Sequence, residues 1–518
     1  MQKLADHATT NNNHSLPADH ANRLYAQPPS IQSPTTQSQT TQPPSTQPQT
    51  SQSPNTTLTL PQALRITIAN YPKIKAAQNI VNASDLEVKA ARQDGLPDLT
   101  AGAELAYGTL DGLNGHASGE PGLTTLTNGP VTTSQNWNAA FGALYLTNID
   151  FNLYSFGLQR AHVAAAKGQY HQDKNNLDQQ IFQQQVQVAG AYLALLAAHQ
   201  VRLAMEANLA RTLDLRDVIL ARTLNGLNAG VDSSIADAEV AKARLTLIDA
   251  KNFEQQQANR LSIQMGITPE ALRQYAATNQ PGAVPLDAEA VQTIRLDTTS
   301  VQKLPGNLLE TPTTDLADHP GLRYLASQIT TSNLNASYFQ KIGLPRLSLF
   351  GVGQERGSGF GPKYATNLND YTTNFFTGIQ PQRANYLLGL ALTWDITNLG
   401  RSHSRAAAQR ERSQAFTQEY NLEKNTLVNQ LSLSDQQIRN ALDKYKETPV
   451  QLQAATEAYT QKKALYENGL NNIVDVSQTL YLLNRAEIDR DIAVNAVWQA
   501  LLFKAGVQGN LTPFLQQF

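Results

Sequence analysis

The residues of this 518-residue sequence that could carry out chemistry are few and scattered. Its nine histidines form no His-x-x-x-His or His-Glu-x-x-His pair of the kind that holds a metal ion. Gly351, Gly353 and Gly357 miss the spacing of a dinucleotide-binding loop, and no phosphate-binding loop of the Walker type is present. There is no cysteine, so no residue could serve as a thiolate ligand, a cysteine nucleophile or a lipid-modified N-terminal cysteine. We therefore predict no enzyme activity, no metal site and no cofactor.

Two acidic residues are of interest because each follows the same turn. Asp475 ends the segment NGLNNIVD at 468–475, and Asp232 ends the similar segment NGLNAGVD at 225–232. Long Ala- and Gln-rich stretches with helical spacing flank both segments. An Asn-Gly pair in that position is expected to end one helix and reverse the chain into the next. An Asp just after the turn could cap the second helix. The sequence thus predicts two helical hairpins of one design, and we take their tips as the working ends.

The similarity between the two halves extends beyond these turns. Landmarks recur in the same order at two offsets, which are 248 residues up to Pro97 and 243 residues from Gly157 onward. They are Pro72 and Pro320, the Gly-Leu-Pro runs at 95–97 and 343–345, Gly157 and Gly400, and Gly266 and Gly509. A period this long indicates a duplicated half-protein rather than a solenoid. We predict a first repeat at 58–270, a Pro-, Asp- and Thr-rich linker at 271–318, a second repeat at 319–511 and a C-terminal tail at 512–518.

Composition narrows the class of protein. The net charge is −2, which gives no electrostatic footprint for nucleic acid. Charged residues make up only 16% of the chain, and Gln, Asn, Ser and Thr carry the polarity instead, as in many envelope or secreted proteins. No apolar run has the length of a membrane-spanning helix. No export signal is visible, so for an exported protein we expect the signal to lie outside this numbering. The Gln/Thr/Pro-rich residues 1–57 are predicted to be disordered.

Period-2 alternation of apolar side chains predicts four β-strands, near 97–108, 136–152, 345–356 and 385–398. Around Trp394 the alternation runs through Tyr386, Leu388 and Leu390 to Ile396. A Gly- and Asn-rich loop separates the strands of each pair. Strands of about 10 residues match tilted membrane strands. The pattern alone fits two surface hairpins on a soluble helical body equally well.

Long helices follow each strand pair. One is predicted from Leu158 to about Leu224, a length of roughly 100 Å. Its counterpart is predicted from Arg401 to about Glu467 and contains Pro449, which should kink or interrupt it. Return helices are expected to run to about 265 and 507. Helices of this length need lateral partners along their whole extent.

The strands impose a similar requirement. Four strands cannot close a barrel, and an open sheet edge is not viable in lipid. We therefore expect copies of the chain to complete the sheet. Three copies would supply twelve strands, within the known range of barrels, although the sequence does not fix the number three.

The predicted elements occur in the same order in both halves of the chain. Over about residues 58–511, this arrangement resembles that of the TolC family of outer-membrane efflux channels. The specific segments are Asn70-Tyr71-Pro72, Tyr466-Glu467-Asn468-Gly469 and Ile473-Val474-Asp475-Val476. The resemblance implies a mainly α protein with a membrane β-barrel: a homotrimer whose twelve-stranded barrel, set in outer-membrane lipid, continues into a long periplasmic α-helical barrel. It also implies a periplasmic adaptor (membrane fusion) protein and an inner-membrane transporter as partners, and no catalysis.

The resemblance also assigns residues to the tips. It implies a periplasmic gate at Asp475, Gln478, Asp232, Tyr466 and Asn471. Gln478 departs from the family pattern, which has a second acid there, and Asn471 stands where that pattern has a basic residue. Groups such as Tyr466 or Asp232 are expected to hydrogen-bond against the repulsion between copies of Asp475. Adaptor docking is expected at the tip residues Asn225, Gly226, Leu227, Asn468, Gly469 and Leu470.

Three functional hypotheses follow. The first is a passive channel-tunnel of a tripartite efflux system, which exports small molecules across the outer membrane. The second is the outer-membrane duct of a type I protein secretion system. The third is a coiled-coil scaffold outside any membrane.

Overall fold

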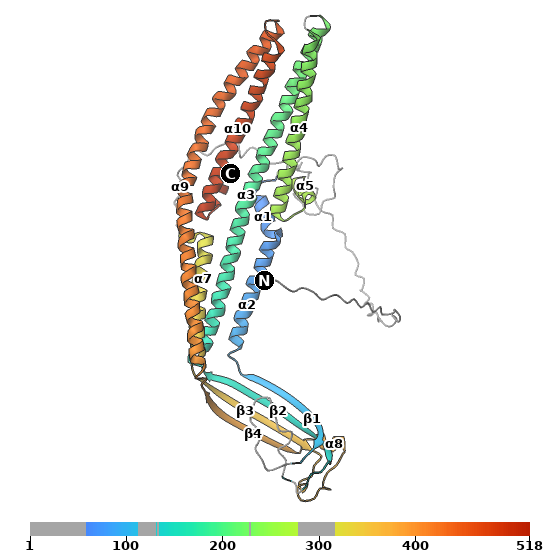
Figure 1. The fold of residues 1–518 in the computed structure, drawn as a ribbon, viewed down its shortest axis with the longest axis vertical. Coiled ribbons are helices and arrows are strands. Elements are labelled where there is room, and N and C mark those ends of the chain that lie inside the picture. The colour runs from blue at the N-terminus through green and yellow to red at the C-terminus, as the bar shows by residue number, and fades with distance from the viewer. Residues whose placement is uncertain (1–57, 112–130, 132–133, 227–228, 278–315) are drawn as a thin grey trace, which may run out of the picture. The chain divides into compact units, whose positions relative to one another are not determined.

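The computed structural model describes residues 58–111, 131, 134–226, 229–277 and 316–518 (Figure 1). The predicted disorder of 1–57, most of the first strand loop, Leu227 and most of the 271–318 linker lie outside these residues. Every element below belongs to one compact unit, Thr56–Phe518. In chain order the elements are α1 (Leu60–Asn70), α2 (Pro72–Gln93), β1 (Asp98–Thr109), β2 (Ala139–Tyr154), α3 (Leu158–Leu224), α4 (Gly230–Met265), α5 (Pro269–Ala277), a 3₁₀ turn (Leu316–Asp318), α7 (Pro320–Ile342), β3 (Arg346–Ser358), α8 (Phe375–Ile379), β4 (Arg383–Thr393), α9 (Asn398–Glu467), α10 (Ile473–Gln508) and α11 (Thr512–Gln517).

The four strands form one antiparallel sheet in the order β1-β2-β3-β4. Each lies within a few residues of the strand that alternation predicted. The last strand is shorter than expected, because β4 ends at Thr393 and leaves Trp394 and Ile396 beyond the sheet. The indole nitrogen of Trp394 instead donates a hydrogen bond to the Gly343 carbonyl at 3.0 Å. Among the described residues, the outer edges of β1 and β4 have no strand partner.

The register divides the side chains of the sheet between two faces, because neighbours across strands point the same way. We call one the apolar face; it carries Leu99, Leu105, Tyr107, Phe141, Ile149, Phe151, Leu349, Tyr386, Leu388, Leu390 and Leu392. We call the other the polar face; it carries Asp98, Thr100, Glu104, Asn148, Asp150, Asn152, Ser348, Gln354, Arg356, Arg383 and Asn385, together with Leu144, Leu146, Phe350, Val352 and Leu387. Glu355 and Thr147 are polar residues on the apolar face. The sheet is therefore amphipathic across its thickness.

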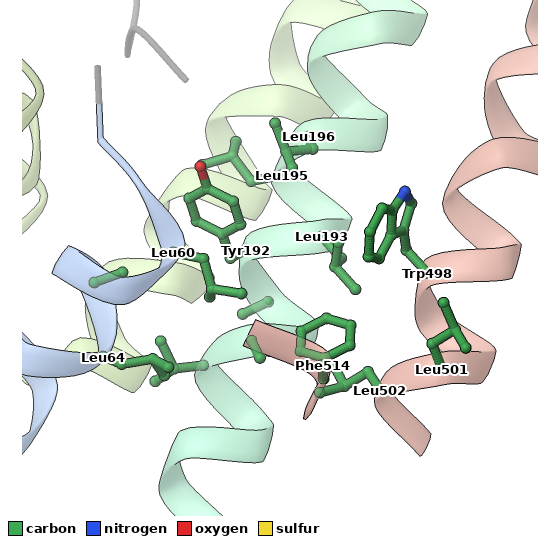
Figure 2. Close-up of a cluster of buried hydrophobic side chains, with 14 of the residues drawn as sticks. Leu60, Leu64, Tyr192, Leu193, Leu195, Leu196, Trp498, Leu501, Leu502 and Phe514 are labelled. Carbon is green, nitrogen blue, oxygen red and sulfur yellow. The ribbon is translucent and has the colours of Figure 1, made fainter. Parts of the chain in front are cut away.

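Helix α3 is the central helix, since α1, α2, α4, α7 and α10 all contact it (Figure 1). In the main core, Tyr192 and Leu193 of α3 meet Leu60 of α1 and Trp498 of α10 (Figure 2). The Tyr192 hydroxyl donates to the Leu58 carbonyl at 2.7 Å, so its buried oxygen is paired. An 18-residue window of α3 is apolar enough to cross a membrane, but 61% of it is buried inside the structure. We interpret that window as core.

The C-terminal segment belongs to this core. Residues 512–517 form α11, and Phe514 is buried with its ring against Trp498 at a centroid distance of 5.9 Å. Phe518 contacts the same indole at 5.1 Å. The predicted tail is thus an ordered part of the structure.

Each return helix ends in a left-handed glycine that lies against the start of a proline-initiated helix. A Cβ added to Gly266 (φ +69°) would lie 2.8 Å from the Cα of Tyr71, beside Pro72. A Cβ added to Gly509 (φ +73°) would lie 2.7 Å from the His319 ring, beside Pro320. Only glycine fits both the backbone conformation and the space. The two contacts join landmarks that recur in the sequence.

Charged groups are buried between the helices of the first hairpin. Glu254 of α4 lies 2.7 Å from the His199 ring and 2.6 Å from the Arg202 guanidinium, both on α3. Burial raises the pKa of the Glu254 carboxyl, but its hydrogen bond to His199 and the charge of Arg202 outweigh burial, so the pKa is lowered. The carboxylate therefore stays charged and links α3 to α4.

The second long helix is not interrupted at its proline. Helix α9 is continuous from Asn398 to Glu467 through Pro449, so the predicted interruption is wrong. Pro449 has no N–H for the carbonyl of Tyr445, one turn earlier. The buried Thr448 hydroxyl donates to that carbonyl at 3.0 Å, which supplies a partner in place of the missing N–H.

We expect Thr448→Val to destabilise the protein by about 1–3 kcal/mol, because the Tyr445 carbonyl loses its donor. Thermal loss of helix, followed by circular dichroism in detergent, measures the effect as a lower midpoint. Thr426→Val is the matched control. Its hydroxyl also bonds one turn back, to Leu422, but the amide of residue 426 still serves that carbonyl. Equal midpoints for the two variants would contradict this explanation.

Candidate functional site

The tip of the second hairpin is a tightly hydrogen-bonded reversal. Gly469 has φ +75°, and its N–H donates to the Tyr466 carbonyl at 2.9 Å. The N–H of Leu470 donates to the Leu465 carbonyl at 2.9 Å, which completes a Schellman motif. The Asn472 side chain then caps α10 by accepting from the Asp475 N–H at 2.9 Å. Local sequence thus fixes both the end of α9 and the start of α10.

The first tip follows the same design where the structure describes it. Gly226 has φ +71°, and its N–H donates to the Thr223 carbonyl at 3.0 Å. Asn225 donates from its side chain to the Ala221 carbonyl at 2.7 Å. Asn468 makes the equivalent bond to Ala464 at 2.8 Å in the second tip. Asn225, Gly226, Asn468, Gly469 and Leu470 are all exposed.

Neither Asp232 nor Asp475 is the N-cap residue of its helix. Ala229 occupies the cap position of α4 and Asn472 that of α10, so the helix-cap interpretation of Asp232 and Asp475 is wrong. Both acids lie in the first turn, where the helix dipole favours a carboxylate. Asp475 pairs with Lys462 of α9 at 2.9 Å, and the two side chains are about two-fifths exposed, at 38% and 40%. The ion pair therefore lies within one hairpin.

Tyr466 is buried beneath the tip rather than facing Asp475. Its side chain is 2% exposed and packs with Ile219 of α3 and Ile473 and Val476 of α10. The Arg222 guanidinium lies over the Tyr466 ring, 5.5 Å from its centroid. Tyr466 therefore contributes to the contact between the two hairpins through packing.

Arg222 joins the hairpins at their ends. From the last turn of α3, its Nη1 donates at 2.6 Å to the carbonyl of Glu467, the last residue of α9. Helix C-termini leave carbonyls without an intrahelical partner and carry partial negative charge, so a guanidinium there is doubly favourable. One side chain of the first hairpin thus caps the helix of the second.

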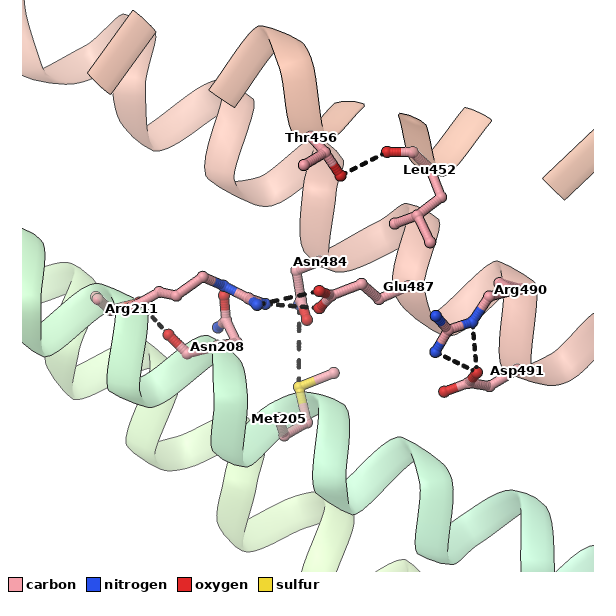
Figure 3. Close-up of polar contacts among 10 residues, drawn as sticks. Met205, Asn208, Arg211, Leu452, Thr456, Asn484, Glu487, Arg490 and Asp491 are labelled. Atoms are coloured by element: carbon pink, nitrogen blue, oxygen red, sulfur yellow. Dashed lines mark hydrogen bonds and ion pairs between the residues drawn. The ribbon is translucent and has the colours of Figure 1, made fainter. Parts of the chain in front are cut away.

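A second link lies further from the tips (Figure 3). Arg211 of α3 forms a bidentate ion pair with Glu487 of α10, at 3.0 and 2.6 Å. Beside it, Asn484 contacts the sulfur of Met205 at 4.0 Å. Between the two links, burial raises the pKa of the Tyr459 hydroxyl, which stays neutral. Two polar contacts with an apolar cluster between them therefore hold the hairpins together.

The remaining predicted gate residues are placed as follows. Gln478 is exposed, one turn into α10 from Asp475. Asn471 lies in the turn, and its side-chain nitrogen is buried with no hydrogen-bond partner among the described residues. Asp232 is partly exposed in the first turn of α4. The structure thus contains two separate contacts. Tyr466 contacts Arg222, and Asp475 contacts Lys462.

Sequence reasoning missed Lys462 and Arg222, and only the first had a usable signal. In an antiparallel hairpin, residues at similar distances from the turn face one another, so a lysine shortly before the turn could be matched to Asp475. Arg222 and Glu467 are 245 residues apart and belong to different hairpins. No local pattern predicts that pair.

The sequence model of the family described as "Outer membrane efflux protein" matches residues 63–266 and 316–501, more than half of the chain. Solved structures share the fold: the outer membrane protein VceC from Vibrio cholerae is 15% identical with a TM-score of 0.63, over 87% of this chain and 96% of its own. The CmeC outer membrane channel of Campylobacter jejuni is 13% identical with a TM-score of 0.64, over 87% and 85%. The MtrE outer membrane channel of Neisseria gonorrhoeae, in its open state, is 16% identical with a TM-score of 0.60, over 87% and 89%. Among curated proteins, no match was found.

Arg222→Met should loosen the second tip. The Glu467 carbonyl would lose its charged hydrogen-bond donor, and the Tyr466 ring would lose the guanidinium that lies over it. Amide hydrogen exchange in peptides covering 462–475 is expected to become faster. Arg244→Met is the matched control, an exposed arginine on α4. Unchanged exchange in the Arg222 variant would show that the contact does not hold the tip.

Proposed function

The chain belongs to the outer membrane efflux protein family, and from this premise we propose that three copies form a passive channel-tunnel of a tripartite efflux system. In this proposal the sheets of three chains close a twelve-stranded barrel in the outer membrane. The helical hairpins, two per chain from two repeats of one unit, form a tunnel through the periplasm. A periplasmic adaptor and an inner-membrane transporter complete the system. Small molecules are the cargo.

The amphipathic open sheet is the observation that carries the proposal. Its apolar face exposes large side chains on β1, β2 and β4, and nothing in the described chain covers most of them. Its outer edges on β1 and β4 have no strand partner in the part of the chain that the structure describes. Pairing with the strands of neighbouring copies would give the backbone groups at both edges hydrogen-bond partners. In lipid such pairing is required, because unpaired backbone groups are too costly there and only a closed barrel avoids them.

Exposed aromatic side chains lie at both ends of the strands. At the helical end these are Tyr154, Phe156 and Trp394, and at the far end Tyr107, Trp137 and Phe376. Aromatic residues gather at the two interfaces of a membrane, where amphipathic rings are favoured. Two such belts support a membrane layer that spans the sheet.

The helices support lateral association in the same way. Helix α9 exposes apolar side chains along its length, among them Leu422, Val428, Leu433 and Val450. An isolated helix pair would leave these in water. In the proposed trimer, neighbouring hairpins cover them and form the wall of the tunnel.

At the narrow end, we propose that copies of Asp475 face one another around the axis. Each carboxylate is held by Lys462 of its own hairpin, which offsets part of the repulsion between copies. Opening would separate the hairpins and break the Arg222–Glu467 contact. We propose the tips, Asn225 to Leu227 and Asn468 to Leu470, as the adaptor-docking surface.

Leu388 and Leu387 test the membrane assignment, because they are adjacent on β4 and belong to opposite faces. They are 69% and 59% exposed, so neither is needed for packing within one chain. We expect Leu388→Arg to cost about 2–4 kcal/mol if the apolar face meets lipid, and to abolish the heat-stable trimer in the outer-membrane fraction. Leu387→Arg, on the face proposed to line the channel, should leave it intact. Equal recovery of both variants from the membrane fraction would sink the barrel assignment, and a protein that fractionates without detergent would favour a scaffold.

Lys462 and Asp475 test the gate in planar-bilayer recordings. Asp475→Asn should lower the preference for cations, since one carboxylate per copy is lost at the narrow end. Lys462→Met should raise it, because the carboxylates lose their counter-charge. Asp443→Asn removes an acid that pairs with Lys446 on the exposed side of α9 and should change nothing. The gate position is refuted if the variants at 475 and 462 leave ion selectivity as in the wild type.

A further inference from the structure

Two arginines stand side by side near the far end of the sheet. Arg356 of β3 and Arg383 of β4 are direct cross-strand partners, and both are exposed. Side chains in such positions have Cβ atoms about 5 Å apart, and like charges there are destabilising. Within the part of the chain that the structure describes, no ion pair of either guanidinium is found. Stability alone therefore does not account for this pair.

The backbone around the two arginines is firmly held. The Gln382 N–H donates to the Arg356 carbonyl at 2.9 Å, and the Gln382 side chain donates to the carbonyls of Ser358 and Thr377 at 2.9 and 3.0 Å. A Cβ at Gly357 would lie 2.5 Å from the Gln380 carbonyl oxygen, so the returning segment packs closely against β3. The register that places one arginine against the other is thus built into the hairpin.

The register also places this pair on the polar face. The row across the sheet reads Glu104, Leu144, Arg356 and Arg383. At the other end of the same face, Asp98 and Asp150 are direct partners, so two acids lie opposite one another there. Residues 98 and 104 are six positions apart, which corresponds to about 20 Å along a strand. The polar face therefore carries an acidic pair near the helices and a basic pair near the far end.

We propose that Arg356 and Arg383 form a basic belt inside the channel near its outer mouth, which binds the anionic groups of passing solutes and makes this end of the channel favour anions. The proposal rests on the trimeric barrel proposed above, in which the polar face lines the lumen. Three copies bring six guanidinium groups against three Glu104 carboxylates, a net positive ring. Rings of arginine select anions in pores, and a guanidinium binds carboxylate or phosphate oxygens in bidentate fashion. The inner acids and outer arginines then give the lumen opposite charge at its two ends.

The experiment compares the wild-type trimer with the double variant Arg356→Gln/Arg383→Gln in planar bilayers of zwitterionic lipid. Reversal potentials in a potassium chloride gradient should shift toward cation selectivity in the variant, with the potassium-to-chloride permeability ratio rising on the order of twofold. Pyrophosphate, added as a polyvalent anionic probe, should reduce the wild-type current and lose that effect in the variant.

Two further variants locate any failure. Glu355→Gln changes a neighbouring charge on the apolar face, and its permeability ratio should match that of the wild type. Asp98→Asn/Asp150→Asn alters the polar face at its other end and should shift selectivity toward anions. If the aspartate variant shifts selectivity but the arginine variant does not, the belt is wrong while the channel stands. A vesicle-binding assay tests the alternative that the arginines face lipid. If the arginine variant keeps the wild-type permeability ratio but binds vesicles that contain anionic lipid more weakly, the inference is overturned. If the wild type forms no channels, the proposed function itself fails.

Discussion

The helical part of the molecule depends on the burial of one helix. Every turn of α3 in its middle third is covered, with Val188, Ala189 and Leu193 fully buried, and five other helices pack on it in succession. Most of the stability of a helix in a protein comes from the packing of its apolar side chains, so lateral burial decides where this 67-residue helix is firmly held and where it can part from its neighbours. Toward the tips the apolar cover thins to the cluster around Tyr466, and specific polar contacts become more important there.

This gradient in packing connects the fold to the site. In the middle of the bundle, α11 closes the core by placing Phe514 and Phe518 against Trp498. Toward the tips, a few polar contacts join the hairpins: Arg222–Glu467 at the ends of the helices and Arg211–Glu487 further from them. Local opening is expected where few buried apolar contacts must be broken, so the ends of the hairpins can move without loss of the core.

Local chemistry explains which features could be predicted from sequence. The turns at Gly226 and Gly469 were predictable because a left-handed residue after a helix selects glycine wherever it occurs. The four strands were predictable because alternation is a property of each strand alone. The residues at which the strands end were less predictable. Strand β4 ends before Trp394, and the indole of Trp394 has a hydrogen-bond partner outside the sheet. The interruption predicted at Pro449 was wrong because helix propensity takes no account of the hydrogen bond that the Thr448 hydroxyl donates to the Tyr445 carbonyl. The link between Arg222 and Glu467 depends on how two distant hairpins are placed side by side, which no local pattern encodes.

The contact between Arg222 and the end of α9 also determines how the tips respond to their surroundings. A guanidinium keeps its proton across the whole physiological pH range, and a backbone carbonyl has none to gain. The contact therefore joins a charged side chain to the partial negative charge at the end of a helix. What can weaken it is competition for the guanidinium, by a concentrated polyvalent anion or by a carboxylate that a docking protein brings to the same spot.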